Sequence, residues 1–550
     1  MRRAFLALLA LVASVGLITT AQARNDDGSD SGASSGSSLT GKDVSELLRD
    51  SFKPEYVIAR LQTLQDIADA NDGNRAAGLP GYKKSASYVA KELKSYGWEV
   101  KREPFDFDAF FQDAPSTFER VSPNPKVFTE DTDFSTMEFS GSGDVTAELV
   151  AVDLTLPPAA EPSSTSGCEA TDFNGLDLTG KIALMQRGTC DFSVKVKNAI
   201  AAGAAGTIIF NEGQEGRTDV VFGTLGAPDI TVPAVDTSFA IGSELANGVL
   251  SGPTGTTAHI KVTAHTENLK AENVIADSPG GDPRHVVMAG AHLDSVMDGP
   301  GINDNGTGSA ALLELANLLS TNGVAPNNKV RLAWWGAEEE GLIGSTDYVD
   351  GLKKKELNNI ALYLNFDMVG SPNFGRLIYD GDGDAFDSKG PKGSDAIEST
   401  FEKYFKKEGL ATGPTAFDGR SDYLAFIDSG IPAGGLFTGA EEVKTDKEAK
   451  KFGGKAGKAF DPCYHQACDD IGNVSRKAIK QMVPAILDSI GRYSMDLGSI
   501  GSGKGGKKGE RAAAGSSSGE YLGNHLQRRY EYFSHPPDRQ GEKHAAPAAR

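Results

Sequence analysis

The chain contains 550 residues, more than one hydrophobic core usually supports, so we expect two globular units with extensions. Its formal net charge of −20 at pH 7 argues against a nucleic-acid-binding protein, because affinity for phosphate depends on clustered lysine and arginine residues. We therefore expect no nucleic-acid partner.

The N-terminus has the three parts of a secretory signal peptide. Two arginines follow Met1, an apolar run covers residues 4–20, and a small-x-small cleavage site lies at residues 21–23. We expect a signal peptide over residues 1–23; the alternative is a retained membrane anchor. No later apolar run is long enough to span a bilayer. The mature chain is therefore expected to have no membrane span and to be secreted, into the medium or, where an outer envelope retains it, the periplasm.

Two further segments have compositions that cannot bury enough apolar surface to fold. Residues 24–40 are mostly Gly, Ser and Asp, and we predict a disordered linker or propeptide over residues 24–50. After Lys504 the chain again turns to Gly, Lys, Ser and Arg, and we predict a low-complexity tail over residues 499–550.

Between these segments, helical patterns alternate with short apolar strands. Helical spacing covers residues 56–70 and 84–96, and Gly97 stands where the second helix should end. An apolar-faced helix at residues 310–319 separates the first two strands of the later part. The predicted strands are residues 285–289, 330–335 and 361–366. This alternation predicts an α/β fold, a doubly wound sheet with helices on both faces.

Residues 118–264 have a different character and are rich in Thr, Val, Gly and Pro. They include a short strand at residues 181–185 and one Ala-rich helix near residues 196–205. We interpret them as a second, β-rich unit inserted into the first, which then consists of residues 51–117 and 265–498.

The four cysteines form two local pairs. Cys168 pairs with Cys190 and Cys463 with Cys468, one bridge in each unit. Free buried thiols or a zinc site are the alternatives, but neither pair has the two-residue spacing of a zinc knuckle. The export signal favours disulfides, because they persist in oxidising compartments.

Polar residues follow the predicted strands where an open α/β sheet builds its sites. His292 and Asp294 follow the first strand, and Asp294 can hold the second nitrogen of a ligating imidazole. A lone histidine at such a position is more often structural. Asp304 lies in the next glycine-rich turn, where the backbone can approach a metal closely.

The ends of the next two strands add further carboxylates. Glu338 and Glu339 follow the second strand, and Asp367 closes the third. Carboxylates that converge on one sheet edge repel each other unless cations neutralise them. His465 lies far downstream, in a loop that a Cys463–Cys468 bridge would stiffen. This mixture of nitrogen and oxygen donors suits zinc better than magnesium or calcium. The candidate ligands are His292, Asp304, Glu339, Asp367 and His465.

At these residues the sequence resembles the secreted co-catalytic zinc aminopeptidases, the metallopeptidase family of bacterial leucyl aminopeptidase and aminopeptidase Y. The resemblance covers residues 56–115 and 265–495. Its strongest elements are Ala-His-Leu-Asp-Ser at 291–295, Asn-Asp-Asn-Gly-Thr-Gly at 303–308, Trp-Gly-Ala-Glu-Glu at 335–339 and Asn-Phe-Asp-Met at 365–368. The insert resembles a protease-associated domain, by Arg-Gly-Thr-Cys at 187–190 and Ala-Ala-Gly-Ala-Ala-Gly at 201–206.

The resemblance implies a zinc exopeptidase fold, which is a doubly wound mixed sheet with helices on both faces. It also implies an aminopeptidase activity. The chain would hydrolyse the first bond of peptide substrates with a free N-terminus, using two zinc ions, a bridging water and a glutamate base. Relatives favour large apolar N-terminal residues, and we expect a monomer.

The resemblance also implies a role for each site residue. Asp304 would bridge the metals, with His292 and Asp367 completing one site and Glu339 and His465 the other. Glu338 would be the general base, and Arg420 and Tyr464 would donate hydrogen bonds to the oxyanion. The resemblance further implies a cis peptide bond at Asp304-Asn305.

The same fold also hosts other functions. A carboxypeptidase or dipeptidase is the nearest alternative; a glutaminyl cyclase would use one metal, and a receptor-like binding protein should have lost ligands or base. The complete set of residues favours the aminopeptidase.

Overall fold

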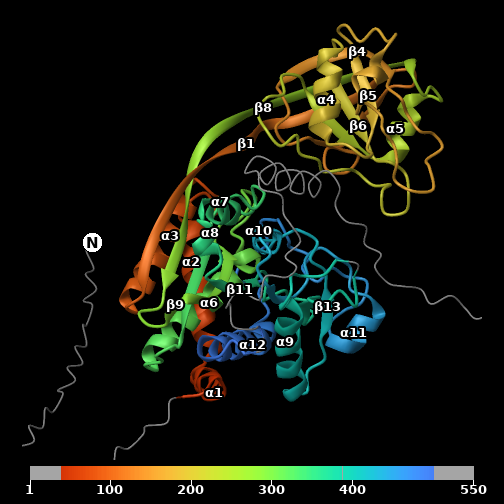
Figure 1. Cartoon of the computed structure of the whole chain (residues 1–550). Coiled ribbons are helices and arrows are strands. Elements are labelled where there is room, and N and C mark those ends of the chain that lie inside the picture. The colour runs from red at the N-terminus through yellow and green to blue at the C-terminus, as the bar shows by residue number, and fades with distance from the viewer. Residues whose placement is uncertain (1–38, 387, 499, 501–550) are drawn as a thin grey trace, which may run out of the picture. The chain divides into compact units, whose positions relative to one another are not determined.

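The computed structural model describes residues 39–386, 388–498 and 500 (Figure 1). The predicted signal peptide lies outside the described residues, as do residues 24–38 of the predicted linker and, except for Ile500, the predicted tail. None of the helices in the described part is long and apolar enough to cross a membrane.

The last part of the predicted linker is helical, so the prediction of disorder was wrong there. Helix α1 spans Gly41–Ser51 and begins with a capping box between Thr40 and Asp43. Its apolar residues Val44 and Leu48 are fully buried, and the helix packs against α12 (Arg476–Met495). The Gly- and Ser-rich composition of the preceding residues concealed this short amphipathic segment.

The larger unit is built on a mixed sheet, as predicted. Four parallel strands lie in the order β14-β11-β9-β10, and antiparallel neighbours flank them on both sides. The central strands are β9 (Asp282–His292), β10 (Asn328–Trp335), β11 (Ile360–Phe366) and β14 (Ala433–Phe437). The flanking strands are β12 (Leu377–Tyr379) with β13 (Gly413–Thr415) on one side, and β8 (Gly252–Asp277) with β1 (Glu99–Ser122) on the other.

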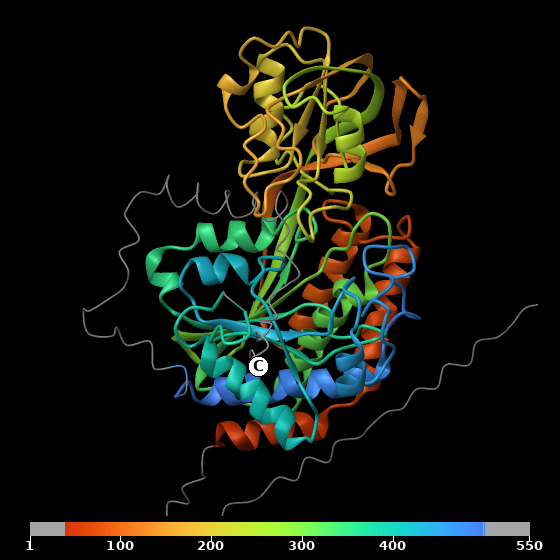
Figure 2. The same cartoon turned by 90° about the vertical axis from the view of Figure 1, so that its right-hand side faces the viewer.

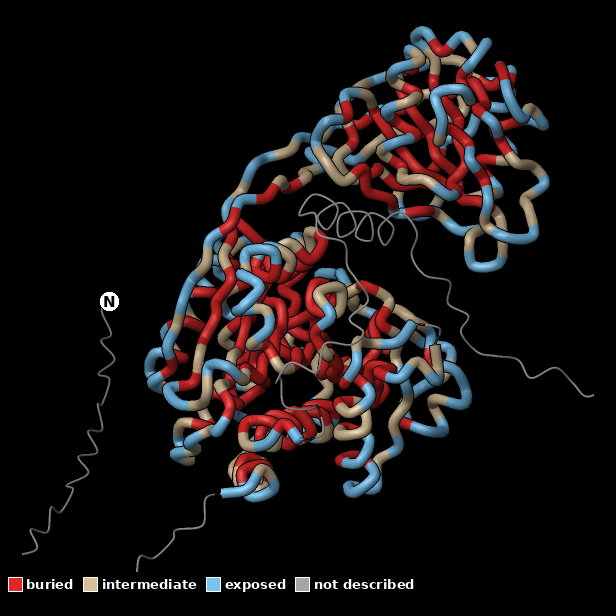
Figure 3. The backbone as a smooth tube through the Cα atoms, viewed as in Figure 1, coloured by how far each residue is buried: buried red, intermediate tan, exposed pale blue. Residues whose placement is uncertain are grey.

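Helices cover both faces of this sheet. Successive residues of a strand point to opposite sides, so apolar residues of the strands on each face need a covering layer. Leu332 and Trp334 of β10 pack on one face, whereas Ala333 and Trp335 pack on the other. The first face is covered by α1, α2 (Pro54–Asp69), α3 (Pro80–Ser95), α6 (Thr307–Thr321), α9 (Ser394–Lys407) and α12. The second face is covered by α7 (Ile343–Gly351), α8 (Lys354–Leu357) and α10 (Leu424–Asp428). Figures 2 and 3 show the helices around the buried strands.

The inserted unit, residues 118–264, has two apolar clusters of its own, and its strands continue the sheet of the larger unit through β8. Strands β4, β5, β6 and β7 are parallel neighbours, and α4 and α5 pack against them. Its elements are β2 (Lys126–Phe128), β3 (Phe134–Thr136), β4 (Gly143–Ala151), η1 (Ala170–Phe173), β5 (Ile182–Gln186), α4 (Phe192–Ala201), β6 (Gly206–Phe210), β7 (Ala234–Thr237) and α5 (Phe239–Ala246).

The junction of the inserted unit lies within two long antiparallel strands. Strands β1 and β8 pair along most of their length, with register shifts between Gln112, Ala114 and Thr117. The predicted boundaries at 118 and 264 therefore fall inside strands rather than in loops.

Both predicted disulfides are present. Cys168 is bonded to Cys190 in the inserted unit, and Cys463 is bonded to Cys468 in the larger unit. The described residues contain no free cysteine.

Candidate functional site

The predicted site residues converge at the carboxyl ends of three neighbouring parallel strands. His292 is the last residue of β9, Glu338 and Glu339 lie just beyond β10, and Asp367 directly follows β11. The parallel arrangement brings these ends to one edge of the sheet. Asp304 comes from the turn before α6.

Asp304 lies between the two histidines. Its Oδ1 is 3.1 Å from His292 Nε2, and its Oδ2 is 3.4 Å from His465 Nε2. Asp367 Oδ1 lies 3.3 Å from the same nitrogen of His292, and Glu339 Oε2 lies 2.9 Å from that of His465. The five residues therefore form two groups of three that share Asp304.

The donor chemistry of these two groups fits zinc. Each group presents one imidazole nitrogen and two carboxylates, with the possible donor atoms of a group within 4.8 Å of one another. Glu339 Oε1 is buried and has no hydrogen-bond partner in the described part of the chain. A buried carboxylate oxygen without a donor is costly unless a cation neutralises it.

The charges of the site also call for cations. Burial by itself would lower the pKa of His292, but the carboxylates around it, above all Glu338 and Asp367, raise this pKa well above its ordinary value. The pKa of His465 is raised well above its ordinary value against the same effect of burial, by Glu339 and Asp304. Protons on the imidazoles and metal ions are alternative ways to neutralise these acids.

Asp294 lies beside the second ring nitrogen of His292, Nδ1. It is fully buried, and its Oδ1 is 3.7 Å from His292 Nδ1, longer than an ordinary hydrogen bond. Its other oxygen, Oδ2, accepts the backbone N–H of Glu339 at 3.2 Å. Asp294 thus contacts both the β9 and β10 ends of the site.

Glu338 is less closely engaged than its neighbour Glu339. Its Oε2 lies 3.9 Å from His292 Nε2, and the side chain lines the pocket. Burial raises the pKa of Glu338 well above its ordinary value, although His292 acts in the opposite direction. A nearby, proton-accepting carboxylate is the group that general-base catalysis requires.

Arg420 and Tyr464 lie together at the pocket. Arg420 Nη2 is 3.2 Å from the Tyr464 hydroxyl, and Arg420 Nη1 donates to Glu441 at 2.8 Å. The Tyr464 ring stacks on the ring of His465, with centroids 3.8 Å apart. Burial raises the pKa of Tyr464 well above its ordinary value, so its hydroxyl stays protonated and can donate a hydrogen bond.

The pocket combines the acidic site with an apolar wall. Asp304, Glu338, Glu339 and Asp367 line it where the strands end. Its other lining residues are Met368, Tyr379, Thr415, Ala416, Asp418, Arg420, Ser421, Phe437, Ala440, Glu442 and Tyr464. The pocket therefore offers apolar surface directly beside the candidate ligands.

A chain of hydrogen bonds that local sequence spacing does not reveal supports Asp367. Ser421 Oγ donates to Asp367 Oδ2 at 2.6 Å, and Asn365 Nδ2 donates to Ser421 at 2.8 Å. Tyr363 donates to Asn365 at 3.1 Å, and Trp335 donates to Tyr363 at 2.8 Å. The strands and loops that carry these residues could be predicted from the sequence, but which of the side chains contact one another depends on how the strands pair.

A second missed residue, Asp469, holds the turn that carries Asp304. Its carboxylate accepts the backbone N–H groups of Asn303 and Asp304, each at 2.9 Å. Asp461 accepts the side chain of Asn303 at 2.6 Å. The closeness of both acids to His465 in the sequence could have indicated that they lie at the site, because they belong to the loop that carries this candidate ligand.

Arg75 is a third missed residue. Its side chain is fully buried and donates to the carbonyls of Pro300 at 2.9 Å, Gly301 at 2.6 Å and Leu293. It therefore ties the segment after β9 to the turn before Asp304. The Asp304-Asn305 peptide is cis, as the resemblance implied.

Comparison with known proteins agrees with this geometry. The model of peptidase family M28 matches residues 273–490, and the PA domain model matches residues 145–245. An aminopeptidase of Pseudomonas aeruginosa is 49% identical over 77% of this chain and 78% of its own. Leucine aminopeptidase 2 of Trichophyton tonsurans is 42% identical over 82% of this chain and 86% of its own. The structure of a zinc aminopeptidase from Bacillus subtilis is similar with a TM-score of 0.54 and 25% identity, over 80% of this chain and 94% of that one.

Proposed function

Because the chain belongs to peptidase family M28 and is a zinc-dependent aminopeptidase, we propose that it holds two zinc ions and releases the N-terminal residue of peptides. The observation that carries the proposal is the pair of ligand groups that meet at Asp304. In this proposal His292 and Asp367 complete one site and Glu339 and His465 the other, while each oxygen of Asp304 faces one histidine. Five ligands of these types exceed the four that one tetrahedral zinc takes.

Zinc, when bound, polarises the scissile carbonyl and makes water a better nucleophile at neutral pH. The protein must then supply a proton acceptor. Glu338 takes the proton of the attacking water and returns it to the departing amine. Its distance of 3.9 Å from His292 Nε2 and its place on the pocket wall support this role.

Arg420 and Tyr464 stabilise the negative charge that develops on the carbonyl oxygen. Their donor atoms lie 3.2 Å apart, so both can approach one oxygen. The stacking of Tyr464 on His465 holds the hydroxyl beside the metal-ligand cluster. Glu441 orients the guanidinium from its other side.

The substrate is a peptide with a free N-terminus and, preferentially, a large apolar first residue. The surplus of carboxylates at the site favours an N-terminal ammonium. Met368, Tyr379 and Phe437 give the pocket the apolar surface that such a side chain buries. The relative from Trichophyton tonsurans bears the name leucine aminopeptidase, which supports the same preference.

The mature enzyme acts outside the cytoplasm, as a monomer. The two disulfides support this location, together with the signal sequence over residues 1–23. We assign residues 51–117 and 265–498 to the catalytic domain and residues 118–264 to the inserted PA domain.

A substrate panel on the purified mature chain tests this function. Leucyl, glutamyl and lysyl p-nitroanilides are compared with N-acetyl-leucyl p-nitroanilide, with and without a chelator. We expect hydrolysis of the leucyl compound with the largest kcat/KM, no hydrolysis of the acetylated compound, and loss of activity with the chelator. Hydrolysis of a peptide with a blocked N-terminus from its C-terminal end would instead support a carboxypeptidase.

A further inference from the structure

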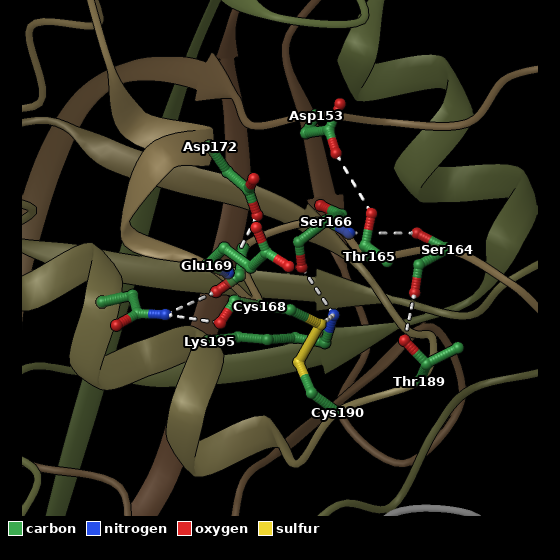
Figure 4. The surroundings of a disulfide bond; sticks show 12 residues. Asp153, Ser164, Thr165, Ser166, Cys168, Glu169, Asp172, Thr189, Cys190 and Lys195 are labelled. Carbon is green, nitrogen blue, oxygen red and sulfur yellow. Dashed lines mark hydrogen bonds between the residues drawn. A yellow bond between two sulfur atoms is a disulfide. The ribbon is translucent and has the colours of Figure 1, made fainter.

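One buried cation of the inserted unit lies against a disulfide bond. Lys195, on α4, is fully buried; its Nζ donates to the Ser166 carbonyl at 2.5 Å and lies 3.5 Å from Cys168 Sγ (Figure 4). Burial lowers the pKa of Lys195 to about 8, against the attraction of the more distant carboxylates of Glu212, Asp172 and Asp153, so its side chain is mostly an ammonium at neutral pH. A buried ammonium in such a setting favours any new anion that forms beside it.

Cys168 is held next to Lys195 by contacts that do not depend on the disulfide. Asn198, also on α4, donates through Nδ2 to the carbonyls of Gly167 and Cys168, both at 3.0 Å. Together with the bond from Lys195 to Ser166, these contacts fix residues 166–168 on the helix. The Cys168 sulfur would therefore remain beside the ammonium if the S–S bond opened.

The two sulfurs of this bridge consequently differ as leaving groups. A neighbouring ammonium lowers the pKa of a thiol, and a sulfur whose thiol has the lower pKa leaves faster in thiol–disulfide exchange. Cys190 Sγ is then the atom that an external thiolate attacks. Cys190 is half-buried beside the exposed Thr189, so a small thiol has a route to it.

We propose that Cys190 is a modification site for small monothiols, with Cys168 as the departing thiolate held by Lys195. The sulfur of the incoming thiolate forms a bond to Cys190 Sγ, the Cys168–Cys190 bond breaks, and its electron pair moves to Cys168 Sγ. The products are a mixed disulfide on Cys190 and a Cys168 thiolate beside the Lys195 ammonium. No further oxidant, reductant or proton is needed for this step.

The second disulfide provides an internal comparison. The Cys463–Cys468 bridge lies in an acidic segment, between Asp461 and the adjacent Asp469 and Asp470. The side-chain contact of Cys468 Sγ is with Gln466 Oε1 at 4.0 Å, which offers no positive charge. The Cys463–Cys468 bridge should therefore exchange more slowly, although it lies in a more exposed segment.

The test maps the product of exchange on the full mature chain. The protein is incubated with graded concentrations of reduced glutathione, quenched with acid, blocked with N-ethylmaleimide and analysed by peptide mass spectrometry. We expect glutathione on Cys190 and maleimide on Cys168, in at least about tenfold excess over the reverse pattern. Equal labelling of the two cysteines, or faster exchange at Cys463–Cys468, would overturn the proposal.

Two lysine variants isolate the role of the charge. Lys195→Met removes the ammonium but keeps a long side chain, and exchange at Cys190 should slow about tenfold with loss of selectivity. Lys197→Met is the matched control on the same helix, because Lys197 pairs with Asp229 at 2.8 Å; its exchange should equal that of the wild type. An unchanged rate in Lys195→Met contradicts the proposal. If that variant does not fold, Lys195→Arg, which keeps the charge, should retain the wild-type labelling pattern, and loss of that pattern counts against the proposal.

Discussion

The carboxylate of Asp469 accepts the backbone N–H of Asp304 at 2.9 Å, so the loop before α12 positions the residue shared by both candidate metal groups. The same loop carries His465, which faces Asp304 and Glu339. The segment that supplies one candidate ligand therefore also holds the backbone of another.

The first prediction concerns this support. Asp469→Asn keeps the size of the side chain but replaces one acceptor oxygen with a donor, so one of the two backbone N–H groups loses its partner. Zinc affinity should fall about 10–100-fold, the usual effect of removing a group that supports a metal ligand. Metal content after dialysis against graded chelator measures this. Asp470→Asn, at the adjacent exposed position, should bind zinc like the wild type, and equal affinity in both variants would contradict the role of Asp469.

The second prediction separates the neighbouring acids Glu338 and Glu339. Glu338→Gln should retain both metals and the fold while kcat falls about 10²–10⁴-fold, because glutamine cannot accept the proton of water. Glu339→Ala should instead lose affinity for one metal. Metal analysis and kinetics on the two variants decide this. A Glu338→Gln enzyme that keeps most of its turnover, or loses metal as readily as Glu339→Ala, would show that the two roles are assigned wrongly.

The third prediction tests the oxyanion donor. Tyr464→Phe removes the hydroxyl but keeps the ring that stacks on His465, so zinc content should remain unchanged. The kcat should fall about 10²–10³-fold with little change in KM, since the hydroxyl acts on charge that develops in the transition state. Loss of metal in this variant would point to a structural role of the tyrosine through His465.

The fourth prediction concerns a buried acid of the inserted unit. Burial raises the pKa of Asp236 to about 8, although hydrogen bonds from Ser135 and Gly223 act against this shift. The folded state therefore keeps a proton that the unfolded state, with its ordinary pKa of 3.8, releases. The stabilising contribution is complete below that pKa and is lost as the pH rises through about 8.

Hydrogen exchange of the β6 and β7 amides, corrected for intrinsic rates, measures the effect. Protection in the wild type should fall between pH 5 and pH 8, and Asp236→Asn should remove most of this slope because its side chain does not titrate. Asp229→Asn, at a position paired with Lys197 on the surface, is the control and should keep the wild-type slope. A wild-type slope in Asp236→Asn would show that another group is responsible.

The fifth prediction concerns the Cys463–Cys468 bridge. This bridge closes a loop with a sequence separation of 5, and short loops contribute little to global stability. The double variant Cys463→Ser, Cys468→Ser should unfold near the wild-type temperature but lose kcat/KM, because Tyr464 and His465 are no longer held. Parallel loss of activity and of the unfolding transition temperature would refute this local role.

Three of the candidate ligands could be predicted from sequence because each follows an apolar strand. His292, Glu339 and Asp367 are placed by parallel strands whose ends must meet, and the apolar patterns of those strands are local. His465 was a candidate only as a histidine in a loop that a disulfide would stiffen, since nothing local links that loop to the sheet. The helices on both faces of the sheet were predicted from the alternation of strand and helix patterns along the chain.

The supporting residues could not be predicted, because their partners are distant in sequence. Arg75 donates to the Pro300 carbonyl, 225 residues away, and Ser421 donates to Asp367, 54 residues away. Such contacts depend on tertiary packing that spacing does not encode. Helix α1 was missed for a different reason: its capping box and two buried residues are too short a signal beside a Gly- and Ser-rich segment.

If two zinc ions share Asp304, a zinc titration of the metal-free enzyme should detect both of them. Calorimetry gives the number of ions bound per chain, and leucyl p-nitroanilide hydrolysis is followed in parallel. We expect two zinc ions per chain, full activity with the second, and weakened binding of both in Asp304→Asn. Full activity with a single bound zinc, or loss of one ion alone in Asp304→Asn, would contradict this expectation.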